Sequence, residues 1–200
     1  MKNDVILALD TTENSISVAL IETDKVIAHQ YQEMERGQGE ALIPMIQEVL
    51  KKAKYDFKKL TKVAVAIGPG SFTGVRIGLA TARGIGLALN IPVAGVTSFE
   101  AAALETKGKV LVVLDTKRGD FFTQTFQDGK PVEEAVIRNE EQIRKLNPPA
   151  LTGSGASYLT ETKFNIIAPK YESAIAVGLC SLKNERAPEP LYLRDADVSI

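Results

Sequence analysis

Residues 5–11 read Val-Ile-Leu-Ala-Leu-Asp-Thr, a continuous apolar run that ends in an aspartate and a threonine. Residues 110–116 repeat the pattern as Val-Leu-Val-Val-Leu-Asp-Thr. A short apolar run bounded by turn residues is typical of a buried strand, and its return later in the chain indicates an internal repeat. We therefore predict two related lobes, residues 1–107 and residues 108–200, with the boundary at Gly108.

The pattern around the first run predicts three strands followed by alternating helices and strands. Apolar residues alternate at first and then change to helical spacing after Gly39. The predicted elements are strands at 5–9, 16–20 and 25–31, a helix at 39–54, a strand at 63–67, a helix at 71–90, a strand at 93–96 and a helix at 98–105. This order is the ribonuclease H-like arrangement, and it disfavours a Rossmann fold, which needs a run of strand-helix-strand units. The predicted fold class is α/β.

The second lobe is predicted to be a reduced version of the first. Asn139 and Gln142 have the spacing of a helix cap, and Ser173 could cap a last helix. The expected elements are strands at 110–114, 121–126 and 150–152, a helix ending at Leu146, a helix ending near Asn184, and an extended tail, Leu191 to Ile200, docked by Leu191, Tyr192 and Leu193.

The composition excludes several classes of function. The 200 residues carry a formal net charge of −1, so the chain as a whole has no electrostatic attraction for nucleic acid. A single cysteine, Cys180, and a single histidine, His29, exclude an intrachain disulfide, a Cys-Cys zinc site and a His-x-x-x-His metal pair. A Ser-His-Asp triad would need His29. With neither a signal peptide nor a long apolar run, we expect a cytoplasmic protein without a membrane segment.

Asp10 and Asp115 each end the first strand of a lobe, an arrangement that resembles the sugar kinase, Hsp70 and actin superfamily. In that superfamily two lobes close on magnesium and nucleotide phosphates, and facing carboxylates can hold a metal-bound phosphate. Its phosphate loops usually carry a glycine after the aspartate, whereas Thr11, Thr12 and Glu13 follow Asp10 here. Asp10, Thr11, Thr12 and Asp115 are therefore candidates for a phosphate site, but we favour aspartates that cap hairpin turns.

The stretch Gly-Pro-Gly-Ser-Phe-Thr-Gly at residues 68–74 joins a predicted strand to a helix N-terminus, where free amide groups attract anions. It is not a Walker A loop, because no Gly-Lys-Ser/Thr follows at the required spacing. It is not Gly-x-Gly-x-x-Gly either, since Thr73 occupies the last position. Anion binding and a tight turn that delivers the helix both remain open.

The lysines at positions 51, 52, 54, 58 and 59 form a basic cluster around Tyr55 and Phe57. Such a cluster usually marks the solvated end of a helix. Contact with RNA is the minority interpretation.

The helix predicted at 71–90 contains four glycines at positions 74, 78, 84 and 86. Each costs about 1 kcal/mol relative to alanine, so tertiary contact must offset the cost. Both this helix and the one predicted at 39–54 have apolar residues on more than one face, and surplus apolar surface suggests a partner. Packing within the lobe and packing against a partner both remain open.

Four stretches of the chain resemble the TsaB (YeaZ) family: residues 6–12, 42–46, 68–78 and 190–194. The Gly-Pro-Gly-Ser-Phe-Thr-Gly-Val-Arg stretch is highly specific, and the matches span nearly the whole chain. The family is similar in fold to the two-lobed superfamily above and is a paralogue of the catalytic subunit TsaD. One departure is Gln38, where relatives often have histidine.

The resemblance implies a non-catalytic scaffold that pairs with TsaD and recruits the ATPase TsaE. Together they transfer a threonylcarbamoyl group to adenosine 37 of tRNA, which this subunit would reach only through the complex. It also implies no intrinsic cofactor, with ATP or ADP only at the complex interface. From apolar surface, we expect a homodimer when the chain is isolated. The partner interface carried onto this sequence comprises Leu42, Ile43, Ile46, Leu50, Gly74, Gly78, Thr81 and Ile85.

Two rival enzyme classes remain. A glycoprotease-like enzyme needs a metal cluster or an activated nucleophile, and the sequence offers neither. An ATP-dependent phosphotransferase needs an adenosine pocket, and we expect the second lobe to be too small to build one.

Overall fold

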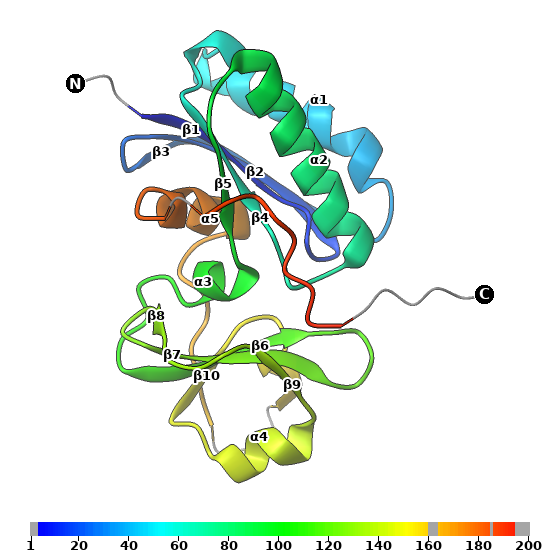
Figure 1. Cartoon of the computed structure of the whole chain (residues 1–200), viewed down its shortest axis with the longest axis vertical. Coiled ribbons are helices and arrows are strands. Elements are labelled where there is room, and N and C mark those ends of the chain that lie inside the picture. The colour runs from blue at the N-terminus through cyan, green and yellow to red at the C-terminus, as the bar shows by residue number, and fades with distance from the viewer. Residues whose placement is uncertain (1–3, 160–163, 185, 195–200) are drawn as a thin grey trace. The chain divides into compact units, whose positions relative to one another are not determined.

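The computed structural model describes residues 4–159, 164–184 and 186–194. The chain forms two compact units (Figure 1), one of Met1–Ser98 and Tyr171–Leu191 and the other of Phe99–Lys170 and Tyr192–Ile200. This division differs from the predicted boundary at residues 107 and 108. Residues 99–107 belong to the second unit, and the last helix with the segment after it packs on the first unit.

The first unit is built on a five-stranded sheet in the order β3-β2-β1-β4-β5. Neighbours β1, β2 and β3 are antiparallel, whereas β4 is parallel to β1 and β5 is parallel to β4. The strands are β1 Val5–Asp10, β2 Ser15–Glu22, β3 Lys25–Glu33, β4 Lys62–Ala66 and β5 Val93–Val96. This topology confirms the predicted ribonuclease H-like arrangement.

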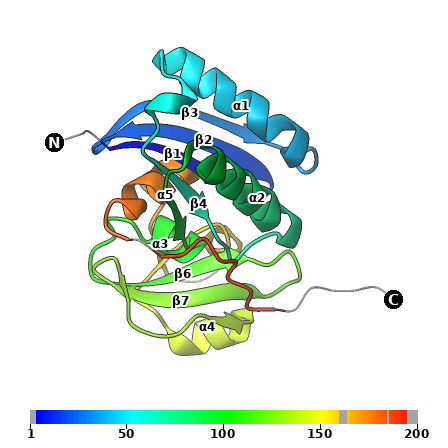
Figure 2. The same cartoon turned by 45° about the horizontal axis from the view of Figure 1, so that its top comes forward.

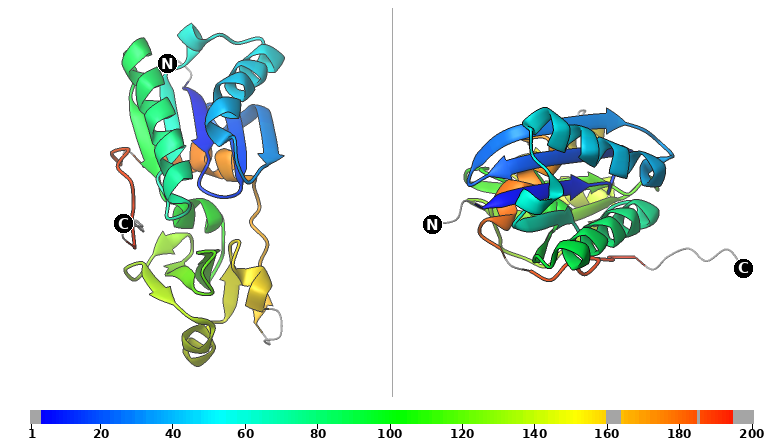
Figure 3. Two further views of the ribbon diagram at one scale, coloured as in Figure 1. Left: turned by 90° about the vertical axis from the view of Figure 1, so that its right-hand side faces the viewer. Right: turned by 90° about the horizontal axis from the view of Figure 1, so that it is seen from above.

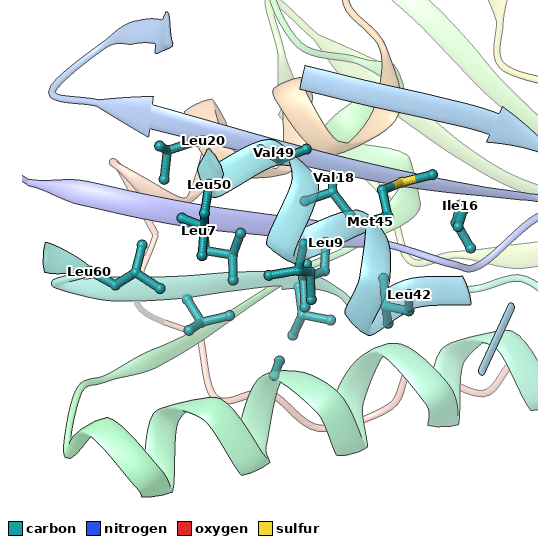
Figure 4. Packing of buried hydrophobic residues seen from close by; sticks show 14 of the residues in the cluster. Leu7, Leu9, Ile16, Val18, Leu20, Leu42, Met45, Val49, Leu50 and Leu60 are labelled. Atoms are coloured by element: carbon teal, nitrogen blue, oxygen red, sulfur yellow. The ribbon is translucent and has the colours of Figure 1, made fainter. Parts of the chain in front are cut away.

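Two long helices, α1 Gln38–Ala53 and α2 Phe72–Leu89, cover one face of this sheet. Helix α1 packs on β2 and β3, and α2 packs on β4 and β1 (Figure 2). Leu42, Met45 and Val49 of α1 point toward apolar side chains of the strands (Figure 4). Ser71 caps α2 as predicted, since its hydroxyl oxygen accepts the N–H of Gly74 at 3.2 Å. The core of the unit lies in this layer.

Helix α5 (Ser173–Ser181) covers the opposite face of the same sheet (Figure 3, left). It approaches β1 and β2 closely, because a Cβ on Gly178 would lie 2.3 Å from Ile21 Cδ1 and 3.1 Å from Ala8 Cβ. Helices on both faces explain why all six residues of β1 are buried. We predicted this helix in the second lobe, and the prediction is wrong. Its small apolar residues allow it to pack closely on the sheet of the first unit.

The segment 186–191 runs beside the edge of the first sheet. The N–H of Gly95 donates to Arg186 O at 2.8 Å, and the N–H of Leu191 donates to Ile67 O at 2.8 Å. Leu191 packs against the core, as expected for a docked tail. The segment therefore shields strand β5, which would otherwise be an open sheet edge.

The second unit is built on a six-stranded sheet in the order β11-β10-β6-β7-β8, with β9 also paired to β7. Strand β6 takes the position of β1, because it pairs antiparallel with the next strand and parallel with a later one. The elements are α3 Ser98–Ala102, β6 Lys109–Asp115, β7 Phe121–Gln127, β8 Lys130–Pro131, β9 Val136–Arg138, α4 Glu140–Leu146, β10 Ala150–Thr152 and β11 Asn165–Ile166. The first residue of α3, Ser98, still belongs to the first unit. Asn139 and Gln142 form the predicted capping box of α4. The second unit is thus a reduced form of the first.

Within the part of the chain that the structure describes, none of the helices combines the length and apolar character needed to span a bilayer.

Candidate functional site

Asp10 is the last residue of β1, and its carboxylate holds the turn that follows. Its Oδ1 accepts the backbone N–H of Thr12 at 2.8 Å and the Thr12 hydroxyl at 2.7 Å. Burial raises the pKa of Asp10 above its ordinary value, against the hydrogen bonds from Thr12 and Ser173, which act to lower it. Asp10 is therefore engaged as the cap of a hairpin turn.

The loop that follows β4 is interlocked with this turn. The N–H of Ser71 donates to Thr12 O at 2.7 Å, and the Thr11 hydroxyl donates to Gly74 O at 2.6 Å. A Cβ on Gly70 would lie 2.4 Å from Thr12 O, and one on Gly74 would lie 1.9 Å from Thr11 O. Only glycine permits this approach, and the contact leaves no room for a phosphate group between the turn and the loop.

Asp115 ends β6 in the second unit and is also engaged by its own turn. Its Oδ1 accepts the N–H of Lys117 at 2.8 Å, and its Oδ2 lies 2.9 Å from Lys117 Nζ. Burial acts to raise the pKa of Asp115, but the hydrogen bonds and charge of Lys117 outweigh it and hold the pKa below its ordinary value. The next acid in this hairpin, Asp120, pairs with Arg194 and Thr116.

The single histidine lies beside a serine. His29 Nε2 is 3.1 Å from Ser17 Oγ, and Ser17 Oγ accepts the N–H of Ala174 at 3.3 Å. Ser17 is fully buried, so its hydroxyl is inaccessible to a substrate. Burial lowers the pKa of His29, partly offset by the negative charge of Glu172. This pair joins α5 to the sheet. Among the described residues, no group of three or more His, Cys, Asp or Glu side chains could hold a metal ion.

Most of the residues assigned to the partner interface lie inside the first unit. Leu42, Ile46 and Leu50 are at most 3% exposed and belong to its core. At 100° per residue these side chains share one broad stripe with Met45 and Val49, so they do not form a second face. The structure therefore reassigns them from the interface to the core.

The two interface glycines are also buried. Gly74 contacts the turn at Thr11, and a Cβ on Gly78 would lie 2.7 Å from Thr11 Oγ1. The close approach that these glycines permit is thus to the unit's own hairpin. Of the remaining candidates, Thr81 and Ile85 are half-buried and Ile43 is 43% exposed.

Two further residues of α2 face solvent and were missed by the sequence reasoning. Leu87 is 85% exposed, and a Cβ on Gly84 would meet nothing within 4 Å. A helical glycine costs about 1 kcal/mol, and Gly84 has no internal contact that requires it. The sequence did contain a signal for this: at 100° per residue, Gly84 points away from the side of α2 on which Gly78 and Ala82 lie. We call Thr81, Gly84 and Leu87, which follow one another at three-residue spacing on α2, the outer helix surface.

A cavity of about 640 Å³ lies where α1 and α2 begin. It contains both acidic and basic side chains, so its charge does not favour one class of ligand. Gln38, in place of histidine, donates from Nε2 to Met34 O at 3.2 Å. The lining residues include Asn14, Glu35, Arg36, Gln38, Glu40, Thr73 and Ile77.

Comparison with known proteins gives one consistent picture. The family model described as TsaD, tRNA N6-adenosine threonylcarbamoyltransferase, matches residues 25–199. The "tRNA threonylcarbamoyladenosine biosynthesis protein TsaB" of Bacillus subtilis is 31% identical over 138 residues, which cover 68% of this chain and 60% of that protein. The chain thus spans less than two thirds of this relative.

Solved structures agree on the fold. YeaZ from Pseudomonas aeruginosa has a TM-score of 0.73 at 21% identity, covering 95% of this chain and all of that one. A polyphosphate/ATP-glucomannokinase from Arthrobacter has a TM-score of 0.53 at 13% identity, covering 90% of this chain and 98% of that one. These likenesses support the two-lobed α/β architecture of the sugar kinase, Hsp70 and actin type.

Proposed function

Since this chain belongs to the TsaB (YeaZ) family of tRNA threonylcarbamoyladenosine biosynthesis proteins, we propose that it is a non-catalytic scaffold subunit. It binds the catalytic paralogue TsaD and recruits the ATPase TsaE for threonylcarbamoyl transfer to adenosine 37 of tRNA. It acts in the cytoplasm, holds no cofactor of its own, and ATP or ADP binds only where the subunits of the complex meet.

One observation carries the non-catalytic part of the proposal: the interlock between residues 11–12 and residues 70–74. A phosphotransferase of this fold would need the turn after β1 to receive a phosphate, whereas here residues 70–74 of the chain itself contact the backbone and side chains of that turn. Asp10 Oδ1 accepts two hydrogen bonds, both from Thr12. The phosphotransferase alternative therefore gains no support from this turn.

The scaffold part of the proposal is supported by the outer helix surface. Leu87 exposes most of its apolar side chain, and nearby Gly84 lets another backbone approach α2 closely. A large exposed leucine beside a small residue is the kind of anchor and close-packing pair that protein interfaces use. TsaD, or a second copy when the chain is alone, is the proposed occupant.

The test is reconstitution of tRNA modification from TsaD, TsaE and the threonylcarbamoyl donor, with and without this chain. We expect modified tRNA only when the chain is present, and Leu87→Arg should reduce both TsaD pull-down and modification at least about tenfold. Leu146→Arg is the matched control, because Leu146 is also exposed near a helix C-terminus but lies in the second unit. Full modification without this chain would overturn the proposal.

A further inference from the structure

Five exposed lysines lie on the first unit where α1 ends. Some are on the last turn and C-cap of α1, and the others are on the following 3-10 turn at Phe57–Lys59. We call this set the lysine cluster; it comprises Lys51, Lys52, Lys54, Lys58 and Lys59.

The lysine cluster is more positively charged than the chain as a whole. Residues 51–59 contain five lysines and one aspartate, a net charge of +4, whereas the whole chain carries −1. Two carboxylates lie beside the cluster. Glu48 accepts a hydrogen bond from Gln30 Nε2 at 3.0 Å, and Glu22 is hydrogen-bonded to Tyr55. Counted with Asp56 and these two carboxylates, the five lysines leave this end of the unit with a net charge of +2.

Only part of the cluster has a structural role. Lys52 Nζ donates to Gln30 Oε1 at 2.8 Å, and Lys59 Nζ lies 5.0 Å from the centre of the Tyr55 ring. Within the described residues, the side chains of Lys51, Lys54 and Lys58 have no hydrogen-bond or ion-pair partner. The negative end of the helix dipole accounts for cations in the last turn of α1, but not for those in the separate 3-10 turn.

We propose that the lysine cluster binds the phosphate backbone of RNA and gives this subunit a direct contact with the tRNA on which the complex acts, in contrast to the contact only through the complex that the family resemblance implies. The choice of RNA as the polyanion rests on the proposed function. Lysine ammonium groups bind phosphates as mobile point charges, and each neutralised phosphate releases counterions.

The cluster binds without reading bases. Its two aromatic residues, Tyr55 and Phe57, are half-buried and pack against the core, so neither ring is available as a stacking platform. Contacts to phosphates alone carry no sequence information. Binding should therefore be similar for tRNA and for unrelated RNA of the same length, and it should depend steeply on salt.

The experiment measures fluorescence anisotropy of a labelled tRNA transcript with the full chain across a series of salt concentrations. The variant Lys51→Gln/Lys54→Gln/Lys58→Gln should lower affinity at low salt by at least about tenfold. It should also make the slope of log K against log salt shallower by about 2 to 3. The arginine variant at the same three positions keeps the charge and should bind like the unchanged chain.

The control variant Lys107→Gln/Lys109→Gln/Lys130→Gln removes the same charge from exposed positions of the second unit and should leave the affinity unchanged. An equal loss in this control would overturn the proposal, as would binding of anionic lipid vesicles but not of tRNA. TsaD pull-down separates the two hypotheses: a chain that captures TsaD but shows no lysine-dependent RNA affinity refutes the RNA contact alone. A chain that binds RNA through the cluster but does not capture TsaD refutes the scaffold.

Discussion

Asp10 and Asp115 make the same hydrogen bond in different units: in each, Oδ1 accepts the N–H of the residue two positions later at 2.8 Å. Their electrostatic surroundings are opposite. Burial dominates at Asp10 and raises its pKa, whereas Lys117 overcomes the smaller burial of Asp115 and lowers its pKa. The two repeats therefore share the same aspartate-capped turn, but the pKa of the aspartate is raised in one unit and lowered in the other.

We expect Asp10→Asn and Asp115→Asn to change stability in opposite directions at neutral pH. A raised pKa means that ionised Asp10 weakens the fold above its ordinary pKa, so the neutral amide should raise the melting temperature. Asp115 stabilises above its ordinary pKa and loses this effect as pH falls through its lowered value, so its replacement should lower the melting temperature slightly. Thermal unfolding at neutral pH compares the two, and changes of the same sign would contradict this account.

His29 should make stability depend on pH. Its pKa in the folded chain is below the ordinary 6.5, so the unfolded chain binds more protons between the two values. Stability from the neutral ring should be fully present above about pH 6.5 and decline as pH falls through the lowered pKa. His29→Gln should flatten this part of the curve of melting temperature against pH. An NMR titration with a pKa above 6.5 would refute the prediction.

Two glycine substitutions in α2 should have opposite effects. Gly74→Ala places a methyl group against Thr11 O and should destabilise the first unit by about 3 kcal/mol or more. Gly84→Ala adds a methyl group in open space and should stabilise by about 0.5–1 kcal/mol. Gly78→Leu should also destabilise the first unit, because a Cβ at this position would lie 2.7 Å from Thr11 Oγ1. Urea unfolding of the variants measures both, and a neutral Gly74→Ala would show that the interlock with the turn is loose.

The reassignment of α1 residues is tested by two neighbours. Leu42→Ala should cost about 2–5 kcal/mol because it empties part of the core. Ile43→Ala removes an exposed side chain and should cost less than about 1 kcal/mol. Chemical denaturation separates them, and similar losses at both positions would contradict the assigned faces of α1.

The isolated chain should form a homodimer through the outer helix surface. Leu87→Arg should convert it to a monomer in sedimentation experiments at micromolar concentration, because a charge replaces the apolar anchor. A monomeric profile of the unchanged chain over the same concentrations would count against the dimer.

Local patterns predicted most of the fold. Alternation and helical spacing located the strands and helices of the first lobe, and the cap residues Ser71 and Asn139 take the roles expected of them. Ser173 does not, because it is the first residue of α5 and Glu172 takes the cap position. The sequence analysis assigned α5 to the wrong unit, because a short apolar run indicates that a helix is buried but not which sheet it packs on. The glycines of α2 illustrate the same limit. Gly78 and Gly84 look alike in sequence, yet one contacts Thr11 Oγ1 and the other has open space around it.

The contribution of α5 and of segment 186–191 to the first unit has a consequence for synthesis on the ribosome. Ile6, Ala8 and Ile21 line the face that α5 covers, and they are translated long before it. Domains usually fold in the order in which they emerge. Here the amino-terminal unit stays incomplete until its last residues leave the exit tunnel, so a nascent chain stalled before α5 presents a bare apolar sheet face to chaperones.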